Sequence, residues 1–216
     1  MKKLLLVALL GLGVFGVVGL NAAKIEISKE QAELMGECVN DKNVASCQKL
    51  IDSDRLVSVE KCEEMMFCYA TGRIYANVEN YHQALKYYEK VCKSKDDISA
   101  SICYEVADFY KAGKGTRQDF AKAKTYYEKA CNAGIDDACV DLGVLYRTGN
   151  GVKQNYSTAK KYFEKACNAD VARGCVLLGV LYGLGEGVKQ DYSTAKNYAG
   201  KACDLGEQLG LSLIHI

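Results

Sequence analysis

The stretch CVDLGVLYRTGNGVKQNYSTAKKYFEKACNADVARG, residues 139–174, is followed at once by CVLLGVLYGLGEGVKQDYSTAKNYAGKACDLGEQLG, residues 175–210. The two stretches are identical at 22 of 36 positions, and residues 103–138 follow the same template. Within each unit, apolar residues recur at intervals of three and four, stop at a Gly-x-Gly and then resume. This pattern predicts tandem units of helix, glycine turn and helix.

The ends of the predicted helices carry residues that suit those positions. Glycine adopts the left-handed conformation that ends many helices, and one stands where each first helix should end: Gly113, Gly149 and Gly185. Short polar side chains accept N–H groups of a first helical turn, and one precedes each second helix: Asp119, Asn155 and Asp191. The Gly-x-Gly has no strand before it and no Gly-Lys-Ser/Thr after it, so we interpret it as a turn and not as a phosphate-binding loop.

The N-terminal third of the chain is less regular. Residues 68–102 form a 35-residue variant of the unit, and residues 24–67 suit an irregular helical cap on the stack. Residues 1–23 have the order of a secretory signal peptide, with Lys2 and Lys3 before an apolar run that ends in small residues. We expect this segment to be cleaved, which would leave a secreted or periplasmic protein that is not held in the membrane.

The C-terminal end departs from the template after residues 175–210. Leu211 stands where the repeat requires a cysteine, and residues 211–216, LSLIHI, match the translation of a transposase-type sequencing adapter. We therefore expect a C-terminally truncated array with a non-native tail. Leu178 and Leu181 should then be partly exposed, because the next helix is missing.

Charge argues against a nucleic-acid partner. The 28 basic residues fall to 26 once Lys2 and Lys3 are removed with the signal, against 27 acidic residues. A nucleic-acid-binding domain normally carries a clear basic excess. The sequence also predicts no cofactor.

The quoted repeats resemble the Sel-one-like repeat, a relative of the tetratricopeptide repeat, in segments such as LGVLYRTGNGV (142–152) and AKKYFEKAC (159–167). The recurring Lys-Ala-Cys and the export signal narrow the resemblance to the Helicobacter cysteine-rich protein family, over residues 38–210. The resemblance implies an all-α fold, a right-handed α/α solenoid of disulfide-linked helical hairpins. It also implies a β-lactamase activity, since that family carries this label and some members are described as binding penicillin derivatives.

All 11 cysteines follow the signal, so disulfides are expected in an oxidising compartment. Short turns bring cysteines at the ends of consecutive helices within reach of each other. The expected pairs are Cys38 with Cys47, Cys62 with Cys68, Cys92 with Cys103, Cys131 with Cys139, and Cys167 with Cys175. Cys103 with Cys131 is an open alternative, because both lie at the same end of one hairpin. Cys203 is expected to be unpaired.

The sequence pattern disfavours two other kinds of site, a structural zinc site and a catalytic serine. A structural zinc site is not expected, because Cys-x-x-Cys is absent and the only histidines are His82 and His215. Ser157 and Lys160, repeated as Ser193 and Lys196, match the Ser-x-x-Lys of penicillin-recognising enzymes. We interpret them as the first turn of a repeated helix, and no nucleophile, base or oxyanion hole can be assigned from the sequence.

On the predicted first helices, a stripe of residues at three-and-four spacing lies beside the core positions. Its residues differ from repeat to repeat, and it is our candidate binding surface. In a stack of helical hairpins the first helices line the concave surface, so this stripe should form a groove floor: Glu105, Asp108, Ala112, Asp141, Val144, Thr148, Leu177, Val180 and Leu184. The sequence thus predicts an exported scaffold that binds an extracellular or periplasmic peptide or protein in this groove. The alternative is a weak β-lactam or peptidoglycan-fragment hydrolase, as the resemblance implies.

Overall fold

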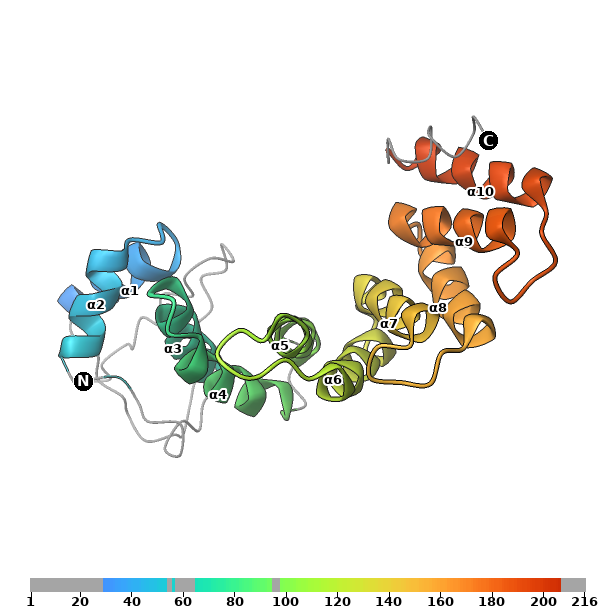
Figure 1. Cartoon of the computed structure of the whole chain (residues 1–216). Helices are drawn as coiled ribbons and strands as arrows, with labels where there is room; N and C mark the ends of the chain where they lie inside the picture. Colours follow the sequence, from blue (N-terminus) through green and yellow to red (C-terminus); the bar gives the residue numbers. More distant parts are fainter. Residues whose placement is uncertain (1–28, 54–55, 57–64, 95–97, 207–216) are drawn as a thin grey trace. The chain divides into compact units, whose positions relative to one another are not determined.

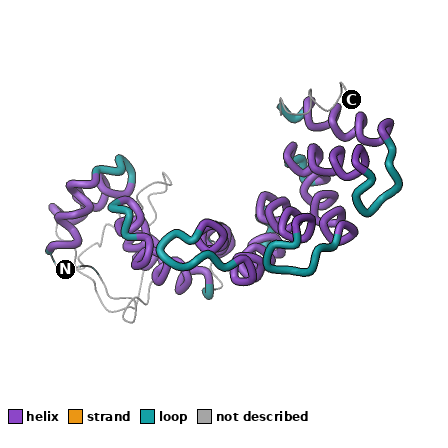
Figure 2. Tube along the Cα trace, in the orientation of Figure 1, coloured by secondary structure: helices purple, strands orange, loops and turns teal. Residues whose placement is uncertain are grey.

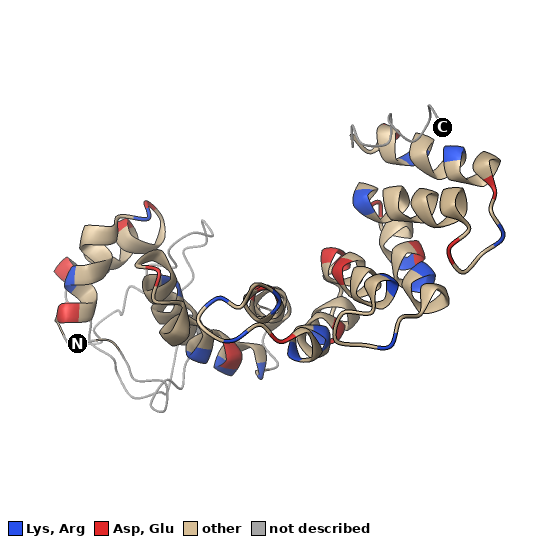
Figure 3. Cartoon of the chain, viewed as in Figure 1, with Lys and Arg blue, Asp and Glu red and all other residues tan. Residues whose placement is uncertain are grey.

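The computed structural model describes residues 29–53, 56, 65–94 and 98–206. Those residues form ten α-helices and no strand (Figures 1 and 2), which confirms the all-α prediction. The chain divides into two compact units, Met1–Lys90 and Val91–Ile216. The expected signal peptide and the tail at 211–216 lie outside the described residues. Figure 3 shows basic and acidic residues mixed over the helices of both units.

The first unit contains the expected N-terminal cap and most of the variant repeat. Its helices are α1 (Lys29–Val39), α2 (Val44–Asp52), α3 (Met65–Asn77) and α4 (Tyr81–Cys92), the last of which ends in the second unit. Cys38, Cys47, Leu50 and Ile74 form a buried core between α1, α2 and α3. This core is small, so the disulfide within it should contribute much of the stability with which these three helices pack together.

The second unit is a stack of three antiparallel hairpins. They are α5 (Ser99–Ala112) with α6 (Phe120–Asn132), α7 (Asp136–Thr148) with α8 (Tyr156–Asn168), and α9 (Ala172–Leu184) with α10 (Tyr192–Asp204). The second helix of each hairpin also packs against the first helix of the next, α6 on α7 and α8 on α9 (Figure 1). Each hairpin therefore shares its core with its neighbours.

The predicted helix ends are confirmed. Gly113, Gly149 and Gly185 end α5, α7 and α9 with positive φ angles of 71°, 79° and 72°. The side chains of Asp119, Asn155 and Asp191 accept the backbone N–H of the third residue of α6, α8 and α10, respectively. A turn that fixes both flanking helices sets the geometry of every hairpin in the same way.

The core repeats with the same period. Val106, Leu142 and Leu178 are fully buried at equivalent positions. Tyrosine rings stack between the two helices of each hairpin with centroids 5.7–5.8 Å apart: Tyr110 on Tyr126, Tyr146 on Tyr162, and Tyr182 on Tyr198. The expectation that Leu178 and Leu181 are partly exposed is wrong, since both are 0% exposed. They lie on α9, which packs between α8 and α10.

Four disulfides join consecutive helices in the described residues. They are Cys38–Cys47, Cys92–Cys103, Cys131–Cys139 and Cys167–Cys175, with Cα atoms 4.7–4.8 Å apart. The open alternative of Cys103 with Cys131 is therefore not formed. Cys68 is also disulfide-bonded, but its expected partner Cys62 lies outside the described residues. Cys203 is a free, half-buried thiol.

Candidate functional site

Asp141 of α7 is the centre of a polar network that joins three hairpins. Its carboxylate accepts a hydrogen bond from the Tyr104 hydroxyl of α5 at 3.0 Å and lies 3.3 Å from the Lys111 ammonium of the same helix. Arg173, at the start of α9, donates from Nη2 at 3.0 Å. The Asp141 side chain is 6% exposed, whereas Lys111 and Arg173 are 37% and 48% exposed. A buried carboxylate thus fixes two partly exposed cations from different repeats.

The burial of Asp141 differs from what we expected from the sequence. We expected Asp141 on an exposed groove floor, where its charge would face a ligand. Its carboxylate is instead buried and occupied by partners from the preceding and the following hairpin. An unpaired buried carboxylate would carry a large desolvation penalty, so the network explains why an acid is tolerated here. Asp141 is a connector between repeats and is not available to a ligand.

Asp108 extends the network towards solvent. Its carboxylate is 2.8 Å from the Lys111 ammonium and accepts a hydrogen bond from the Tyr127 hydroxyl of α6. Burial, assisted by the neighbouring carboxylates, raises the pKa of Tyr104 and of Tyr127 well above the ordinary range. Both hydroxyls therefore remain protonated donors at physiological pH.

The remaining stripe residues lie at or near the surface. Glu105, Asp108 and Ala112 line an open depression together with Phe109, Lys111 and Lys114. Val144, Leu177 and Val180 are half-buried, Thr148 is exposed, and Leu184 at the end of α9 is 62% exposed. Arg173 is the only charged residue of α9. The surface therefore changes from mixed charge on α5 to apolar on α9.

A second set of contacts, which the sequence analysis did not predict, connects each repeat to the previous one. The lysine of each Lys-Ala-Cys donates to the backbone carbonyl of the cysteine that ends the preceding second helix. Lys165 reaches the Cys131 carbonyl at 2.7 Å and Lys201 the Cys167 carbonyl at 2.8 Å, and Lys129 bonds the Cys92 carbonyl in the same way. The regular placement of lysine two residues before each cysteine that ends a second helix was the available signal.

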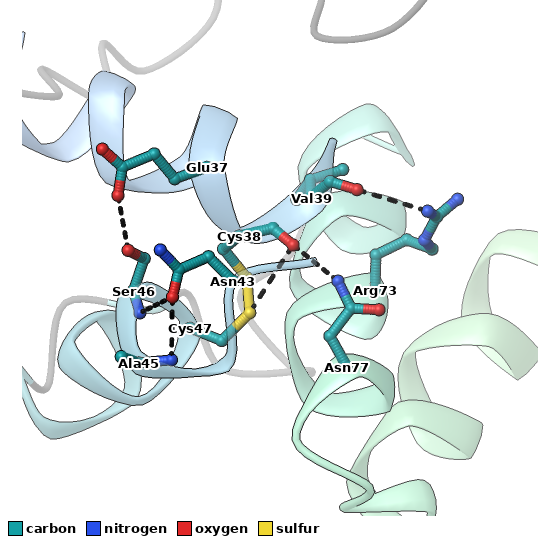
Figure 4. The surroundings of a disulfide bond; sticks show 9 residues. All are labelled: Glu37, Cys38, Val39, Asn43, Ala45, Ser46, Cys47, Arg73 and Asn77. Carbon is teal, nitrogen blue, oxygen red and sulfur yellow. Dashed lines mark hydrogen bonds between the residues drawn. A yellow bond between two sulfur atoms is a disulfide. The ribbon is translucent and has the colours of Figure 1, made fainter. Parts of the chain in front are cut away.

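In the first unit, a cysteine carbonyl at the end of α1 also accepts a hydrogen bond, here from an asparagine in place of a lysine. Asn77 of α3 donates from Nδ2 to the Cys38 carbonyl at 2.6 Å, and Arg73 donates to the Val39 carbonyl at 3.4 Å (Figure 4). These groups satisfy carbonyls at the end of α1 that have no partner within the helix. The first cysteine of each described disulfide thus presents its carbonyl to a later element.

The Ser-x-x-Lys matches lie at the exposed starts of two equivalent helices. Ser157 and Ser193 are exposed second residues of α8 and α10. The Lys160 ammonium is 3.1 Å from the Glu164 carboxylate, and this hydrogen bond is the main cause of a raised pKa for Lys160. A lysine that acts as a general base needs a lowered pKa, so the arrangement does not favour hydrolysis. The described residues also contain no cluster of three His, Cys, Asp or Glu side chains suited to a metal ion.

Tandem 36-residue hairpins with disulfides between neighbours define a helical repeat protein of the Sel1 type. The Sel1 repeat model matches residues 100–135, 136–171 and 172–207, and a tetratricopeptide repeat model matches residues 67–98. The chain belongs to the Sel1 repeat family. The matched repeats have the predicted 36-residue period and begin three residues earlier than the units defined from the sequence.

Solved structures of two other proteins have a similar fold. One is c5321, a protective antigen of uropathogenic Escherichia coli strains with an SLR fold (26% identity, 78% of this chain and 34% of that chain, TM-score 0.63). Another is a Sel1 repeat protein from Oxalobacter formigenes (21% identity, 80% of this chain and 74% of that chain, TM-score 0.62). This chain spans only about a third of the length of the E. coli protein.

Helicobacter pylori cysteine-rich protein B is 32% identical over 63% of this chain and 97% of that chain, with a TM-score of 0.47. This identity confirms the resemblance to the Helicobacter cysteine-rich proteins. No curated protein sequence is significantly similar to this chain.

Proposed function

We propose that this chain is an exported scaffold that binds a peptide or protein on the surface formed by its first helices. Arrays of this kind present extended concave surfaces built from equivalent helices. The observation that carries the proposal is the exposed apolar end of the stripe, where Leu184 lies beside the half-buried Leu177 and Val180 on a helix with a single charged residue. Leu184 extends the partly accessible apolar surface of Leu177 and Val180, and contiguous apolar surface of this kind is characteristic of interaction sites.

The chemistry of the partner follows from the change along the stripe. An apolar side chain of the ligand would contact Leu177, Val180 and Leu184. Polar groups of the ligand would face the depression on α5, where Glu105 and Asp108 stand beside Lys111 and Lys114. Because acids and lysines are mixed there, hydrogen bonding should matter more than net charge at this end.

Export is supported by the disulfides. Buried disulfides persist in oxidising compartments and are rare in the cytosol, and the four bonded pairs of the described residues consist of cysteines that are 0–1% exposed. Within the part of the chain that the structure describes, no helix is both long and apolar enough to cross a lipid bilayer. Residues 1–23, which have the order of a secretory signal peptide, would direct this export.

Peptide selection followed by substitution on α9 tests the proposal. A phage library of short random peptides is selected on the immobilised protein, and the enriched peptide is synthesised with a fluorescent label. Leu184→Glu should weaken its binding at least about tenfold, because an unpaired carboxylate would be desolvated in the complex. Thr125→Glu, on the exposed face of α6, adds the same charge away from the stripe and should leave affinity unchanged. A library without binders, or a binder indifferent to Leu184→Glu, would contradict the proposal.

A further inference from the structure

Charge is unevenly distributed along the first two hairpins of the second unit. Residues 111–124 and 147–161 form the two glycine turns and the helical residues beside them, and they contain nine basic residues and one acidic residue. The rest of residues 99–173 contains three basic and eight acidic residues. Basic residues therefore gather at the turn end of both hairpins, although the chain as a whole is nearly neutral.

The turn ends of these two hairpins form one continuous surface. The turn between α7 and α8 packs on the first residue of α6, so closely that a methyl group on Gly151 would lie 2.5 Å from the Phe120 Cβ. Figure 3 shows basic residues on both turns. Four exposed cations of this surface, which we call the basic edge, are Arg117, Lys122, Lys153 and Lys161.

Most of the basic edge is not neutralised by neighbouring acids. The half-buried Lys124 and Lys160 form ion pairs with glutamates of their own helices at 2.8 and 3.1 Å. Within the part of the chain that the structure describes, Arg117, Lys153 and Lys161 form no ion pair. Their charges are therefore available to a ligand.

The third hairpin shows that this excess charge is not required by the fold. Its equivalent residues, 183–197, contain two basic and two acidic residues. One of these acids, Glu186, is 2.6 Å from the Arg147 guanidinium of the preceding hairpin. A neutral turn is thus compatible with the same hairpin geometry, so the positive charge of the first two turns needs another explanation.

The backbone that carries the turn cations is held by hydrogen bonds. Nε2 of Gln118 and Nε2 of Gln154 each donate at 2.8 Å to a backbone carbonyl in the last turn of the preceding helix. Arg117 and Lys153 come directly before these glutamines. Their backbone positions are therefore set before any ligand arrives, which reduces the entropy lost on binding.

We propose that the basic edge binds a linear anionic polysaccharide that carries sulfate or carboxylate groups. A group of exposed cations complements the repeated charges of such a polymer, and each contact releases counterions, as it does for other polyanions. The exposed large apolar side chains of the described residues lie elsewhere: Val44, Leu184, Tyr192 and Leu205. The basic edge thus lacks the apolar anchors that protein interfaces and membrane-surface helices use.

The choice of a polysaccharide over a nucleic acid rests on the proposed export of the protein, because polysaccharides are the common polyanions outside the cell. The proposal is independent of peptide binding, since none of the four residues of the basic edge belongs to the stripe on the first helices.

Titration of a fluorescently labelled heparin oligosaccharide at several NaCl concentrations tests the proposal, because heparin carries both sulfate and carboxylate groups. The combined substitutions Arg117→Gln, Lys153→Gln and Lys161→Gln should raise the Kd at least about tenfold. They should also reduce the slope of log Kd against log[NaCl] by about two, since three charge contacts are lost. The matched control removes the same charge at exposed positions outside the basic edge, with Lys49→Gln, Lys86→Gln and Lys93→Gln. It should change the Kd less than about threefold, and circular dichroism should show the same helix content in both variants.

Four results would overturn the proposal. Absence of heparin binding at low ionic strength would exclude this ligand class. Equal weakening by the two sets of substitutions would show that net charge alone controls heparin binding. Binding to phosphatidylglycerol vesicles but not to heparin, lost in the Arg117, Lys153 and Lys161 variant, would assign the basic edge to an anionic membrane. Tighter binding of a single-stranded oligonucleotide of equal charge would assign it to nucleic acid.

Discussion

At the residue scale, Asp141 is the most deeply buried acid in the described part of the second unit. It is 5% exposed and accepts hydrogen bonds from two other hairpins. Breaking a buried charge network by removing one partner is strongly destabilising, whereas exposed ion pairs contribute little. Because Lys111 and Arg173 remain partly exposed, water can compensate them in part when Asp141 is lost.

Asp141→Ala should therefore reduce the free energy of unfolding by about 2–4 kcal/mol. Urea unfolding followed by circular dichroism measures the change. The matched control is Asp137→Ala, which removes an exposed acid one helical turn away and should cost less than about 0.5 kcal/mol. Equal stabilities of the two variants would show that the network contributes nothing measurable.

The sequence placed Asp141 on the correct helix but could not show that it is buried. Its position in the variable stripe looks like that of Asp108, which is 40% exposed. The difference arises from Tyr104 and Arg173, which lie 37 and 32 residues away from Asp141 and come close only through the stacking of repeats. Such contacts leave no local periodicity, so they could not be read from the repeat pattern.

At the scale of the helix, local rules predicted most of what is observed. Caps at Asp119, Asn155 and Asp191 and left-handed glycines at Gly113, Gly149 and Gly185 depend only on neighbouring residues. The expected exposure of Leu178 and Leu181 was wrong because it ignored α10, the second helix of their own hairpin. A first helix is covered on two sides before any further repeat is added.

The caps give a test at this scale. Asn155→Ala removes the side chain that accepts the Thr158 N–H at 2.9 Å and should lower the free energy of unfolding by about 1 kcal/mol. Asn155→Asp should be close to neutral at pH 7, because aspartate already caps the equivalent helices at 119 and 191. Thermal unfolding of the two variants side by side distinguishes them. Equal losses would indicate that Asn155 acts through some contact other than the cap.

At the scale of the whole molecule, stability is distributed along the repeats. In such arrays each unit contributes its own stability and an interface with its neighbours, and every described disulfide joins two consecutive helices across a short connection. The disulfides and the lysine–carbonyl contacts act at the same junctions. Loss of one junction should weaken the coupling between the parts on either side.

Replacing Cys131 and Cys139 together by serine should lower stability by about 2–3 kcal/mol, as expected for a short closed loop. It should also broaden the urea transition, because the hairpins on either side unfold more independently. Cys203→Ser is the natural control, since Cys203 is unbonded, and it should leave both midpoint and slope unchanged. A sharp, unshifted transition in the double variant would show that α6–α7 packing alone couples the repeats.

The short spacing of the bonded cysteines also determines the order in which the chain can be oxidised. Bonded partners are 8–11 residues apart in the described pairs, and no other cysteine lies between them. As the polypeptide emerges N-terminus first, each cysteine that completes a pair meets its correct partner before any later cysteine is present. Vectorial oxidation therefore gives the native connectivity without isomerisation, and an oxidant that only joins successive thiols would suffice for these bonds.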